Sequence, residues 1–250
     1  MRFSNKVAFI TGGGAGIGEV YAQALAKEGA AVVLADIDMV VAEAAADRIR
    51  STGGEALAIR CDVGDEVSIK TAVDGAIAKY GGIDILVNNA AKHLSEFSVP
   101  PTKLPLDKWR TMLNVNVVGI VACSAACRET MRARGGGVII NQASISGLTA
   151  TNSYGVSKLA VRGITVALAH ELAADKTRVY CIAPGIVDSP SAMATVPQAS
   201  IDANINKRQL VKRQGKMTDL VGALLFFCSE EASFITGEML VIGGGYPTRI

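Results

Sequence analysis

Short runs of β-branched and aliphatic residues alternate with segments of helical hydrophobic spacing along most of the chain. After the first run, apolar residues recur at helical intervals from Ile17 to Leu25, and Gly29 is a natural stop for that helix. Continuous apolar strands separated by helices are typical of a parallel sheet covered on both faces. The pattern therefore predicts an α/β fold built on a doubly wound parallel sheet. Its expected strands are residues 7–10, 31–35, 57–60, 85–87, 137–141, 179–183 and 239–242.

The whole chain, residues 1–250, is predicted to form a single domain. No Pro/Gly/Ser-rich linker divides it, and no segment repeats at a fixed period. Two segments interrupt the alternation of strands and helices: residues 92–107, with three prolines, and residues 189–215, with no strand pattern. Both follow strands whose carboxyl ends should line a crevice, so we expect them to be loops over a substrate.

Composition argues against several classes of protein. Half of the 250 residues are hydrophobic and the formal net charge is +2, so the chain can bury a large core and offers nucleic acid no general attraction. The five cysteines are odd in number and lie mostly in apolar segments, which is typical of reduced thiols in a cytoplasmic protein. No ligand cluster predicts a metal site. With no leading apolar stretch and no later apolar run of about 18 residues, we expect neither a signal peptide nor a membrane span.

A glycine-rich turn lies between the first predicted strand and the first predicted helix. Residues 11–18 read Thr-Gly-Gly-Gly-Ala-Gly-Ile-Gly. Glycine lets the backbone turn sharply and approach a pyrophosphate, which N–H groups and the positive end of the helix then stabilise. The commoner Gly-x-Gly-x-x-Gly register is absent, because Ile17 and Glu19 stand where its last glycine would fall. The position of the turn still predicts a Rossmann-type dinucleotide site.

An acidic residue ends the second predicted strand. Asp36 lies 20 residues after Gly16, where a carboxylate can accept hydrogen bonds from both ribose hydroxyls of an adenosine. A 2′-phosphate at that place would meet a like charge, and the sequence predicts no Arg beside it. NAD is therefore the expected cofactor, in preference to NADP.

Tyr154 and Lys158 stand one helical turn apart at the start of a long helical pattern, so they project from one face. A phenol has an ordinary pKa of about 10 and is no base at neutral pH unless its anion is stabilised. The neighbouring ammonium group, together with the positive charge of an oxidised nicotinamide, is expected to supply that stabilisation. The pair predicts proton transfer by Tyr154 alongside hydride transfer.

These motifs resemble the short-chain dehydrogenase/reductase family, in register along nearly the whole chain. The pattern Thr-Gly-x-x-x-Gly-x-Gly and the Tyr/Lys pair are the most specific parts of the resemblance. The other matching segments are Cys61-Asp62-Val63, Asn88-Asn89-Ala90, Asn116, Ser144, Pro184-Gly185 and Ile235-Thr236-Gly237.

The resemblance implies roles for individual residues. Tyr154 is the implied acid/base, and Lys158 also holds the nicotinamide ribose. Ser144 is implied to orient the substrate oxygen, while Asn116 carries a water of the proton relay. The remaining contacts are implied for the cofactor, with Asp62 at the adenine amine. The implied cofactor-binding residues are Gly12, Gly14, Gly16, Ile17, Gly18, Asp36, Ile37, Asp62, Val63, Asn89, Ala90, Tyr154, Lys158, Pro184, Gly185, Val187 and Ser189.

The residues that would contact the substrate are less clearly marked in the sequence than those of the cofactor site. Fewer residues separate Ser144 from Tyr154 than in most relatives, but the strand matches the family register up to Ser144 without a gap. We therefore expect Ser144 at the catalytic position and Ser146 in the substrate pocket. His93 follows the fourth predicted strand and is a further candidate for substrate contact. Five basic residues form either a solvated lid face or a site that attracts an acidic substrate: Lys207, Arg208, Lys212, Arg213 and Lys216.

The sequence thus predicts an NAD-dependent oxidoreductase that transfers a hydride between the cofactor and a small-molecule secondary alcohol or ketone. Two alternatives stay open: a 3-oxoacyl thioester reductase of the same family, which would more often use NADPH, and a regulator that binds NAD without turnover. The resemblance also implies a homo-oligomer, a tetramer or a dimer, paired through the helices that begin near Trp109 and Tyr154.

Overall fold

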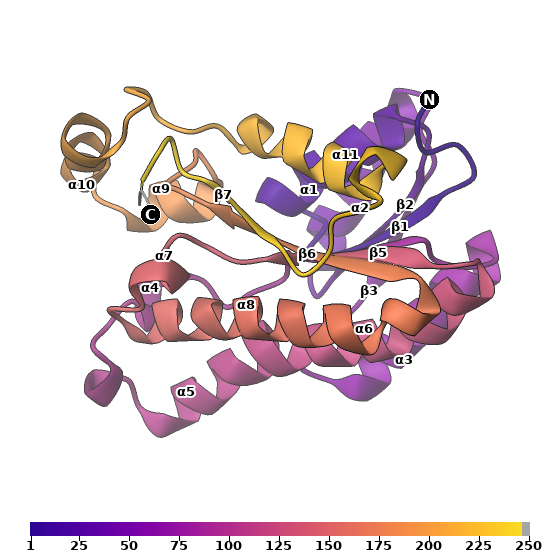
Figure 1. Cartoon of the computed structure of the whole chain (residues 1–250), viewed down its shortest axis with the longest axis horizontal. Helices are drawn as coiled ribbons and strands as arrows, with labels where there is room; N and C mark the ends of the chain where they lie inside the picture. Colours follow the sequence, from indigo (N-terminus) through magenta and orange to yellow (C-terminus); the bar gives the residue numbers. More distant parts are fainter. Residues whose placement is uncertain (247–250) are drawn as a thin grey trace.

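The computed structural model describes residues 1–246, except for the side chains at positions 94 and 95. Residues 247–250, the end of the predicted single domain, lie outside this part. Seven strands form one parallel sheet in the order β3-β2-β1-β4-β5-β6-β7, flanked by helices on both faces (Figure 1). The strands are β1 (Val7–Thr11), β2 (Ala31–Asp36), β3 (Ala56–Arg60), β4 (Ile85–Asn88), β5 (Gly137–Gln142), β6 (Thr177–Pro184) and β7 (Met239–Ile242). The predicted doubly wound sheet is confirmed.

The strand order reverses between β1 and β4, which are hydrogen-bonded neighbours in the sheet. Successive strands run outward from β1 in one direction and from β4 in the other. In an open α/β sheet a ligand binds in the crevice beyond the carboxyl ends of the strands at such a switch point. The topology therefore places the site beyond Thr11 and Asn88, the last residues of these two strands.

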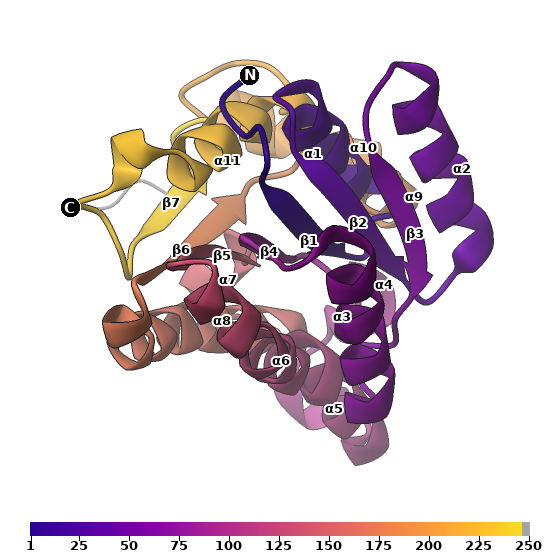
Figure 2. The same cartoon turned by 90° about the vertical axis from the view of Figure 1, so that its right-hand side faces the viewer.

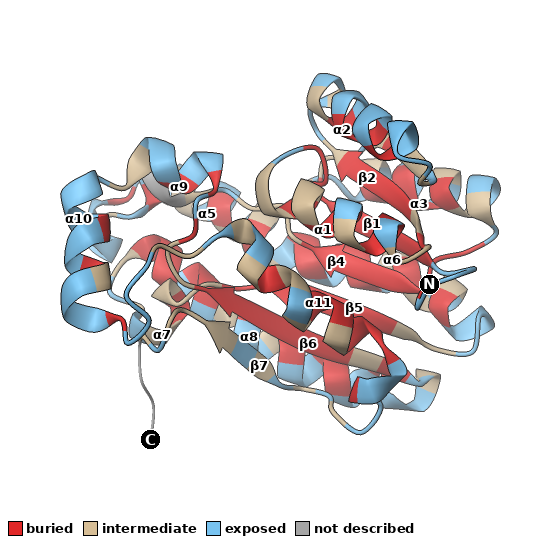
Figure 3. Cartoon of the chain, turned by 90° about the horizontal axis from the view of Figure 1, so that it is seen from above, coloured by how far each residue is buried: buried red, intermediate tan, exposed pale blue. Residues whose placement is uncertain are grey.

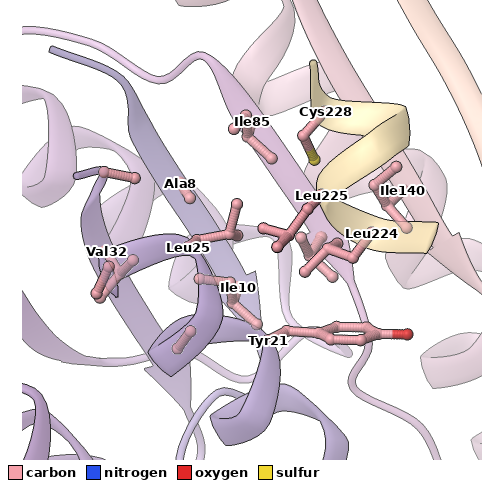
Figure 4. Close-up of a cluster of buried hydrophobic side chains, with 14 of the residues drawn as sticks. Ala8, Ile10, Tyr21, Leu25, Val32, Ile85, Ile140, Leu224, Leu225 and Cys228 are labelled. Carbon is pink, nitrogen blue, oxygen red and sulfur yellow. The ribbon is translucent and has the colours of Figure 1, made fainter. Parts of the chain in front are cut away.

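Helices cover the sheet in two layers, which Figure 2 shows nearly end-on. The first layer holds α1 (Gly16–Lys27), α2 (Met39–Ser51) and α11 (Val221–Cys228), and the second holds α3 (Glu66–Tyr80), α6 (Gly119–Ala133) and α8 (Ser153–Glu171). Between α1, α11 and the sheet, Leu25 and Leu224 pack against Ile10 and Ile140 (Figure 4). The five inner strands are almost fully buried, whereas the edge strands β3 and β7 are partly exposed and the outer helix faces are exposed (Figure 3).

Short polar side chains begin several of these helices. Asp38 accepts hydrogen bonds from the main-chain N–H groups of Val40 and Val41 at the start of α2. Asn152 accepts one from the N–H of Gly155, at 2.7 Å, at the start of α8. Such caps satisfy N–H groups that have no partner inside the helix. The cap on α8 fixes the first turn of the helix that carries Tyr154 and Lys158.

The two predicted substrate loops are largely helical. Residues 92–107 contain α4 (Leu94–Phe97), η1 (Pro101–Lys103) and the first residues of α5 (Leu106–Leu113). Residues 189–215 contain α9 (Pro190–Thr195), α10 (Gln198–Ala203) and the π-helical turn η4 (Asn204–Arg208). Pro190 stands at the first position of α9, where its fixed φ angle suits a helix and its missing N–H costs nothing. The remaining short helices are α7 (Ser146–Thr149), η3 (Ala173–Asp175), η5 (Met217–Leu220) and η6 (Glu230–Ala232).

One helical stretch, Leu106–Ala133, is long and apolar enough to cross a membrane by length and composition, contrary to the sequence expectation. It runs from α5 through the π-helical turn η2 (Asn114–Val118) into α6. Its side chains Ile120, Cys123 and Cys127 are buried in the core between α6 and the sheet. A core helix of a soluble protein passes the same test, so the stretch is weak evidence for a membrane span.

Candidate active site

The glycine-rich turn joins β1 to α1 at the switch point. Gly12 and Gly16 have φ angles of +62° and +58°, a region that favours glycine. A Cβ atom on Gly18 would collide with the carbonyl oxygen of Gly12, whereas one on Gly16 would meet nothing closer than Pro190 Cδ at 3.9 Å. The N-cap residue Ala15 makes no side-chain hydrogen bond to the first turn of α1. The turn therefore presents free N–H groups and open space at a helix N-terminus, which suits a pyrophosphate.

Two polar side chains tie the ends of β1 and β4 together. The Thr11 hydroxyl accepts hydrogen bonds from the N–H groups of Asn89 and Ala90, at 3.0 and 3.1 Å. The Asn89 amide donates in return to the carbonyls of Thr11 and Gly12, at 3.1 and 3.0 Å. This network fixes the glycine turn against the segment that follows β4. The role of Thr11 could have been inferred from its position as the last residue of a strand at the switch point.

Asp36 stands at the carboxyl end of β2, half-buried. Its carboxylate accepts hydrogen bonds from the N–H groups of Gly14, at 3.0 Å, and Asp38, at 3.1 Å. The expectation that no Arg lies beside it is wrong. Arg60 is its register partner on β3, and the Arg60 guanidinium donates to the carbonyl of Ile37 at 2.9 Å rather than pairing with Asp36. The two residues end neighbouring parallel strands, so strand register could have shown this contact.

A cavity of about 530 Å³ opens from the glycine turn across the carboxyl ends of β4, β5 and β6. It brings together segments that are more than 200 residues apart in sequence, from Gly12 to Tyr246. The predicted site residues that line it are Gly12, Gly16, Ile17, Asn89, Ala90, His93, Ser144, Ser146, Tyr154, Lys158, Pro184, Gly185, Val187 and Ser189. Those outside its lining are Gly14, Gly18, Asp36, Ile37, Asp62, Val63 and Asn116.

Ser144 and Tyr154 meet in this cavity. Tyr154 is buried in the first turn of α8, and Ser144 lies two residues beyond the end of β5. Burial raises the pKa of the Tyr154 phenol well above its usual range, and a side-chain hydrogen bond with Ser144 acts in the opposite direction. The Ser144 hydroxyl also accepts a hydrogen bond from the N–H of Ser146, at 3.1 Å. Ser144 is therefore positioned to share an oxygen ligand with Tyr154.

Lys158 lies one turn along α8, but its ammonium group is not hydrogen-bonded to the phenol oxygen. Its Nζ atom donates to the carbonyl oxygen of Gln142 at 2.8 Å and lies 5.8 Å from the centroid of the Tyr154 ring. Burial lowers the pKa of Lys158 to about 8, against a smaller opposing effect of Cys181. No hydrogen bond joins the two side chains, and the expected activation of Tyr154 by Lys158 together with an oxidised nicotinamide stays a prediction. The helix brings Lys158 close to Tyr154, but the main-chain carbonyl of Gln142, at the end of β5, binds the ammonium group and sets its orientation.

Asn116 is fully buried in η2, the π-helical turn between α5 and α6. Its carbonyl accepts a hydrogen bond from the N–H of Lys92 at 2.7 Å, and its amide donates to the Lys92 carbonyl and the Ser157 hydroxyl, both at 3.1 Å. Asn116 therefore joins the helix irregularity to the segment after β4. It contacts Ser157 of α8 and does not line the cavity.

Two buried side-chain atoms lack a hydrogen-bond partner among the described residues, and both belong to residues that line the cavity. The first is Nδ1 of His93, whose ring lies 5.7 Å from the ring of Tyr154. Burial, followed by the charge of Lys158, lowers the pKa of His93, so the ring is neutral at pH 7. The second is Nε2 of Gln142. The side-chain oxygen of the same residue, Oε1, accepts a hydrogen bond from the Tyr21 hydroxyl at 3.1 Å. The sequence analysis missed Gln142, although an amide in an otherwise apolar strand marked it.

Several other candidate cofactor-binding residues lie outside the glycine turn, and two of them, Asp62 and Ser189, accept hydrogen bonds from nearby main-chain N–H groups. Asp62 accepts a hydrogen bond from the N–H of Gly64 at 2.9 Å, which shapes the turn after β3, and Val63 is buried. Ile37 is 54% exposed beside the end of β2. The Ser189 hydroxyl accepts a hydrogen bond from the N–H of Ala192 and caps α9. Taken with the open glycine turn and the unpartnered amide of Gln142, these residues fit a dinucleotide. No metal-ligand cluster occurs among residues 1–246.

Comparison with known proteins decides the family. A family model described as enoyl-(acyl carrier protein) reductase matches residues 12–247. The chain belongs to the short-chain dehydrogenase/reductase family. An uncharacterised oxidoreductase of Mycobacterium tuberculosis is 43% identical over 99% of both chains. A cis-4-hydroxycyclohexanecarboxylate dehydrogenase of Sinomonas cyclohexanicum is 36% identical, over 98% of this chain and 97% of that protein.

A solved structure of a short-chain dehydrogenase/reductase superposes on the chain with a TM-score of 0.92. It is 34% identical and the match covers 98% of this chain and 95% of that one. That protein is a 7α-hydroxysteroid dehydrogenase in complex with NADH and 7-oxo glycochenodeoxycholic acid. The likeness confirms the Rossmann-type fold, and the family membership makes the chain an oxidoreductase.

Proposed function

We propose that the protein is an NAD-dependent dehydrogenase that interconverts a secondary alcohol and its ketone, with Tyr154 as the acid/base. The observation that carries the proposal is the shared cavity, which joins the glycine turn to Ser144, Tyr154 and Lys158. Bound NAD would supply the hydride acceptor. A non-catalytic NAD sensor would need none of these three side chains, and the cavity holds all of them.

The chain's own residues divide the work on the alcohol. Ser144 and Tyr154 bind the substrate oxygen between their hydroxyls, and Tyr154 takes its proton during oxidation or returns it during reduction. Because burial raises the pKa of Tyr154, the phenol of the protein alone is protonated and ready to donate to a ketone. The charge of Lys158, fixed by the Gln142 carbonyl, favours loss of the phenol proton once water is excluded.

Asp36 supports NAD as the cofactor. Two main-chain N–H groups fix its carboxylate at the end of β2, where a ribose hydroxyl can donate to it and a 2′-phosphate would be repelled. Arg60 is bound to the carbonyl of Ile37 and does not neutralise that carboxylate. The 7α-hydroxysteroid dehydrogenase structure with NADH agrees with this choice.

The relatives also support a cyclic alcohol or ketone as substrate, since two of them act on ring substrates by name. The family model's description and the second function considered, a 3-oxoacyl thioester reductase, point instead to a thioester. The test is a panel of cyclic alcohols, hydroxysteroids and 3-oxoacyl and 2-enoyl thioesters, assayed with NAD(H) and NADP(H). We expect turnover of cyclic alcohols with NAD; turnover of thioesters alone would replace the proposal.

Tyr154→Phe tests the acid/base role because it keeps the ring and removes the titrating oxygen. We expect the variant to lose at least about a hundredfold in kcat while its NADH affinity, measured by fluorescence titration, stays within about threefold. Tyr80→Phe, on the distant helix α3, is the matched control. A variant with wild-type kcat would remove Tyr154 from the mechanism.

We further propose that the protein pairs with a second copy through α6 and α8, which lie side by side in Figures 1 and 2. Val121 of α6 and Leu159 of α8 are 44% and 47% exposed, and Val118 and Val166 continue this apolar face. Sedimentation should show a dimer or tetramer. Val121→Glu with Leu159→Glu should dissociate it, and Val40→Glu on the exposed face of α2 should not.

A further inference from the structure

The cavity carries one positive charge that the proposed reaction does not use. Its lining includes three basic residues, His93, Lys158 and Arg208, and no Asp or Glu. The lowered pKa of His93 makes that ring neutral at pH 7, and Lys158 is bound to a carbonyl of β5. Arg208 therefore supplies the available charge on the substrate side.

The neighbouring bases have other positions or partners. Lys212 donates to the carbonyls of Ile205, Asn206 and Gln209. Arg213 forms a bidentate ion pair with Asp219, at 2.7 and 2.8 Å. Lys207 and Lys216 do not line the cavity. Among the five bases noted in the sequence, Arg208 is the one that faces the site, and no acidic side chain of the described residues pairs with it.

Buried amides hold the Arg208 main chain in place. Arg208 is the last residue of η4, between two buried residues, Asn204 and Gln209, whose side chains hydrogen-bond each other at 2.7 Å. Leu210 then donates from its N–H to the carbonyl of Gly244 at 2.8 Å, which anchors the segment to the chain end near α10 (Figure 1). The segment 204–210 thus carries Arg208 at a fixed point rather than on a free loop.

The guanidinium itself is ordered by an aromatic ring. Its central carbon lies 5.4 Å from the ring centroid of Tyr246, and one of its N–H groups donates to the Tyr246 hydroxyl at 3.3 Å. A guanidinium is planar, and the N–H groups of Arg208 that do not bind Tyr246 can donate to both oxygens of a carboxylate. Tyr246 and Arg208 together form a ready anion site on one wall of the cavity.

We infer that the natural substrate is a hydroxy or oxo carboxylic acid whose carboxylate binds Arg208 while its alcohol or ketone oxygen binds Ser144 and Tyr154. The inference rests on the proposed dehydrogenase function and deepens it. The carboxylate is a separate group from the reacting carbon, since the two contacts come from different elements that line one cavity: η4 carries Arg208, and α8 carries Tyr154. Arg208 is a specificity-determining residue and takes no part in proton or hydride transfer.

The experiment compares matched acids and amides that differ in charge alone. The probes are 4-oxocyclohexanecarboxylate with 4-oxocyclohexanecarboxamide, and the longer pair 7-oxooctanoate with 7-oxooctanamide, each reduced with NADH. For at least one pair, the wild-type kcat/KM should favour the acid by about tenfold or more. Arg208→Gln should lower kcat/KM for that acid by about tenfold, mainly through KM, and leave the amide within about twofold. Lys207→Gln, an exposed neighbour that does not line the cavity, should change neither.

A second readout separates this inference from the dehydrogenase proposal. Cyclohexanecarboxylate has no group to oxidise or reduce, and its binding to the protein with NADH can be followed by calorimetry. If Arg208→Gln weakens the binding of cyclohexanecarboxylate and Lys207→Gln does not, the anion site is supported even when no probe is turned over. A lack of turnover of every probe would count against the dehydrogenase proposal alone. Equal kcat/KM for acid and amide in both pairs, or an equal loss on both probes in Arg208→Gln, would overturn the assignment of Arg208.

Discussion

Replacement of Lys158 by Met should change the free energy of unfolding of the protein in a pH-dependent way. The size of this change measures how much the buried ammonium group destabilises the fold. The Lys158 side chain is 3% exposed, and its partner is a neutral carbonyl, Gln142 O, rather than a carboxylate. Burial therefore disfavours the charged form and lowers its pKa from 10.5 to about 8. A Met side chain has similar length and carries no charge. The substitution removes a buried ammonium group that the fold does not pair.

The size of the effect follows from the two pKa values. One pKa unit corresponds to about 1.4 kcal/mol, so a pKa of about 8 against 10.5 is worth about 3 kcal/mol. Folded Lys158 loses its proton near pH 8 and the unfolded chain retains it to about pH 10.5. Over that window the unfolded state binds more protons, so the wild type gains stability relative to Lys158→Met as the pH rises. Near pH 7 the variant should be at least as stable, because the lost hydrogen bond to Gln142 costs only about 1–3 kcal/mol.

Denaturant unfolding of both proteins between pH 7 and pH 10.5 measures this difference. Other titrating groups are common to both proteins and cancel in the comparison. We expect the difference in unfolding free energy to move by about 3 kcal/mol toward the wild type across the window. Lys103→Met, at an exposed position of η1, controls for loss of a lysine that is not buried. Parallel stability curves for wild type and Lys158→Met would refute the argument that the ammonium is buried at a cost.

Two further predictions concern individual positions of the site. Ser144→Ala should lower kcat by about a hundredfold, as expected for loss of a hydrogen bond to the reacting oxygen, and Ser146→Ala should mainly change KM between substrates; steady-state kinetics with the reverse result would mean that the catalytic hydroxyl is Ser146. Asp36→Ala should raise kcat/KM with NADP by about tenfold and lower it with NAD, because the repulsion is removed and Arg60 becomes available to a 2′-phosphate. Adding Arg60→Gln should cancel the gain with NADP, and a gain that survives this second change would exclude Arg60 as its source.

The fold was accessible from the sequence because buried parallel strands are apolar along their whole length. Each predicted strand agrees with the structure to within a few residues, and the largest difference is β6, which begins at Thr177 where the prediction began at Val179. Thr177 and Arg178 are polar, so hydropathy alone began the predicted strand two residues too late. Tertiary pairing with Gly137 and Val138 of β5 extends it.

The segment 189–215 was harder to predict because distant residues determine its structure. A proline is the first residue of α9 (Pro190) and the residue just before α10 (Pro197), a local signal that the sequence carries. The turn after them depends on the pair Asn204 and Gln209 and on the carbonyl of Gly244, more than 30 residues further along the chain than Gln209. A hydrophobic pattern cannot show such contacts. The orientation of Arg208 into the cavity depends on them and could not be predicted.

The identity of the candidate catalytic residues could be predicted from the sequence, whereas the hydrogen-bond partners that set the charge environment of their side chains could not. Spacing on a helix placed Lys158 next to Tyr154, but the strand carbonyl that binds its ammonium group belongs to β5. The result is a site whose polar groups are incompletely satisfied. Lys158 has only a neutral carbonyl as its partner, Nδ1 of His93 and Nε2 of Gln142 have none among the described residues, and all three residues line one cavity. Each unsatisfied buried group costs about 1–3 kcal/mol, which a protein tolerates where a ligand completes the contacts. Because these three residues line the same cavity as the glycine turn and Arg208, binding of cofactor and substrate should raise the stability of the protein beyond what either ligand achieves alone.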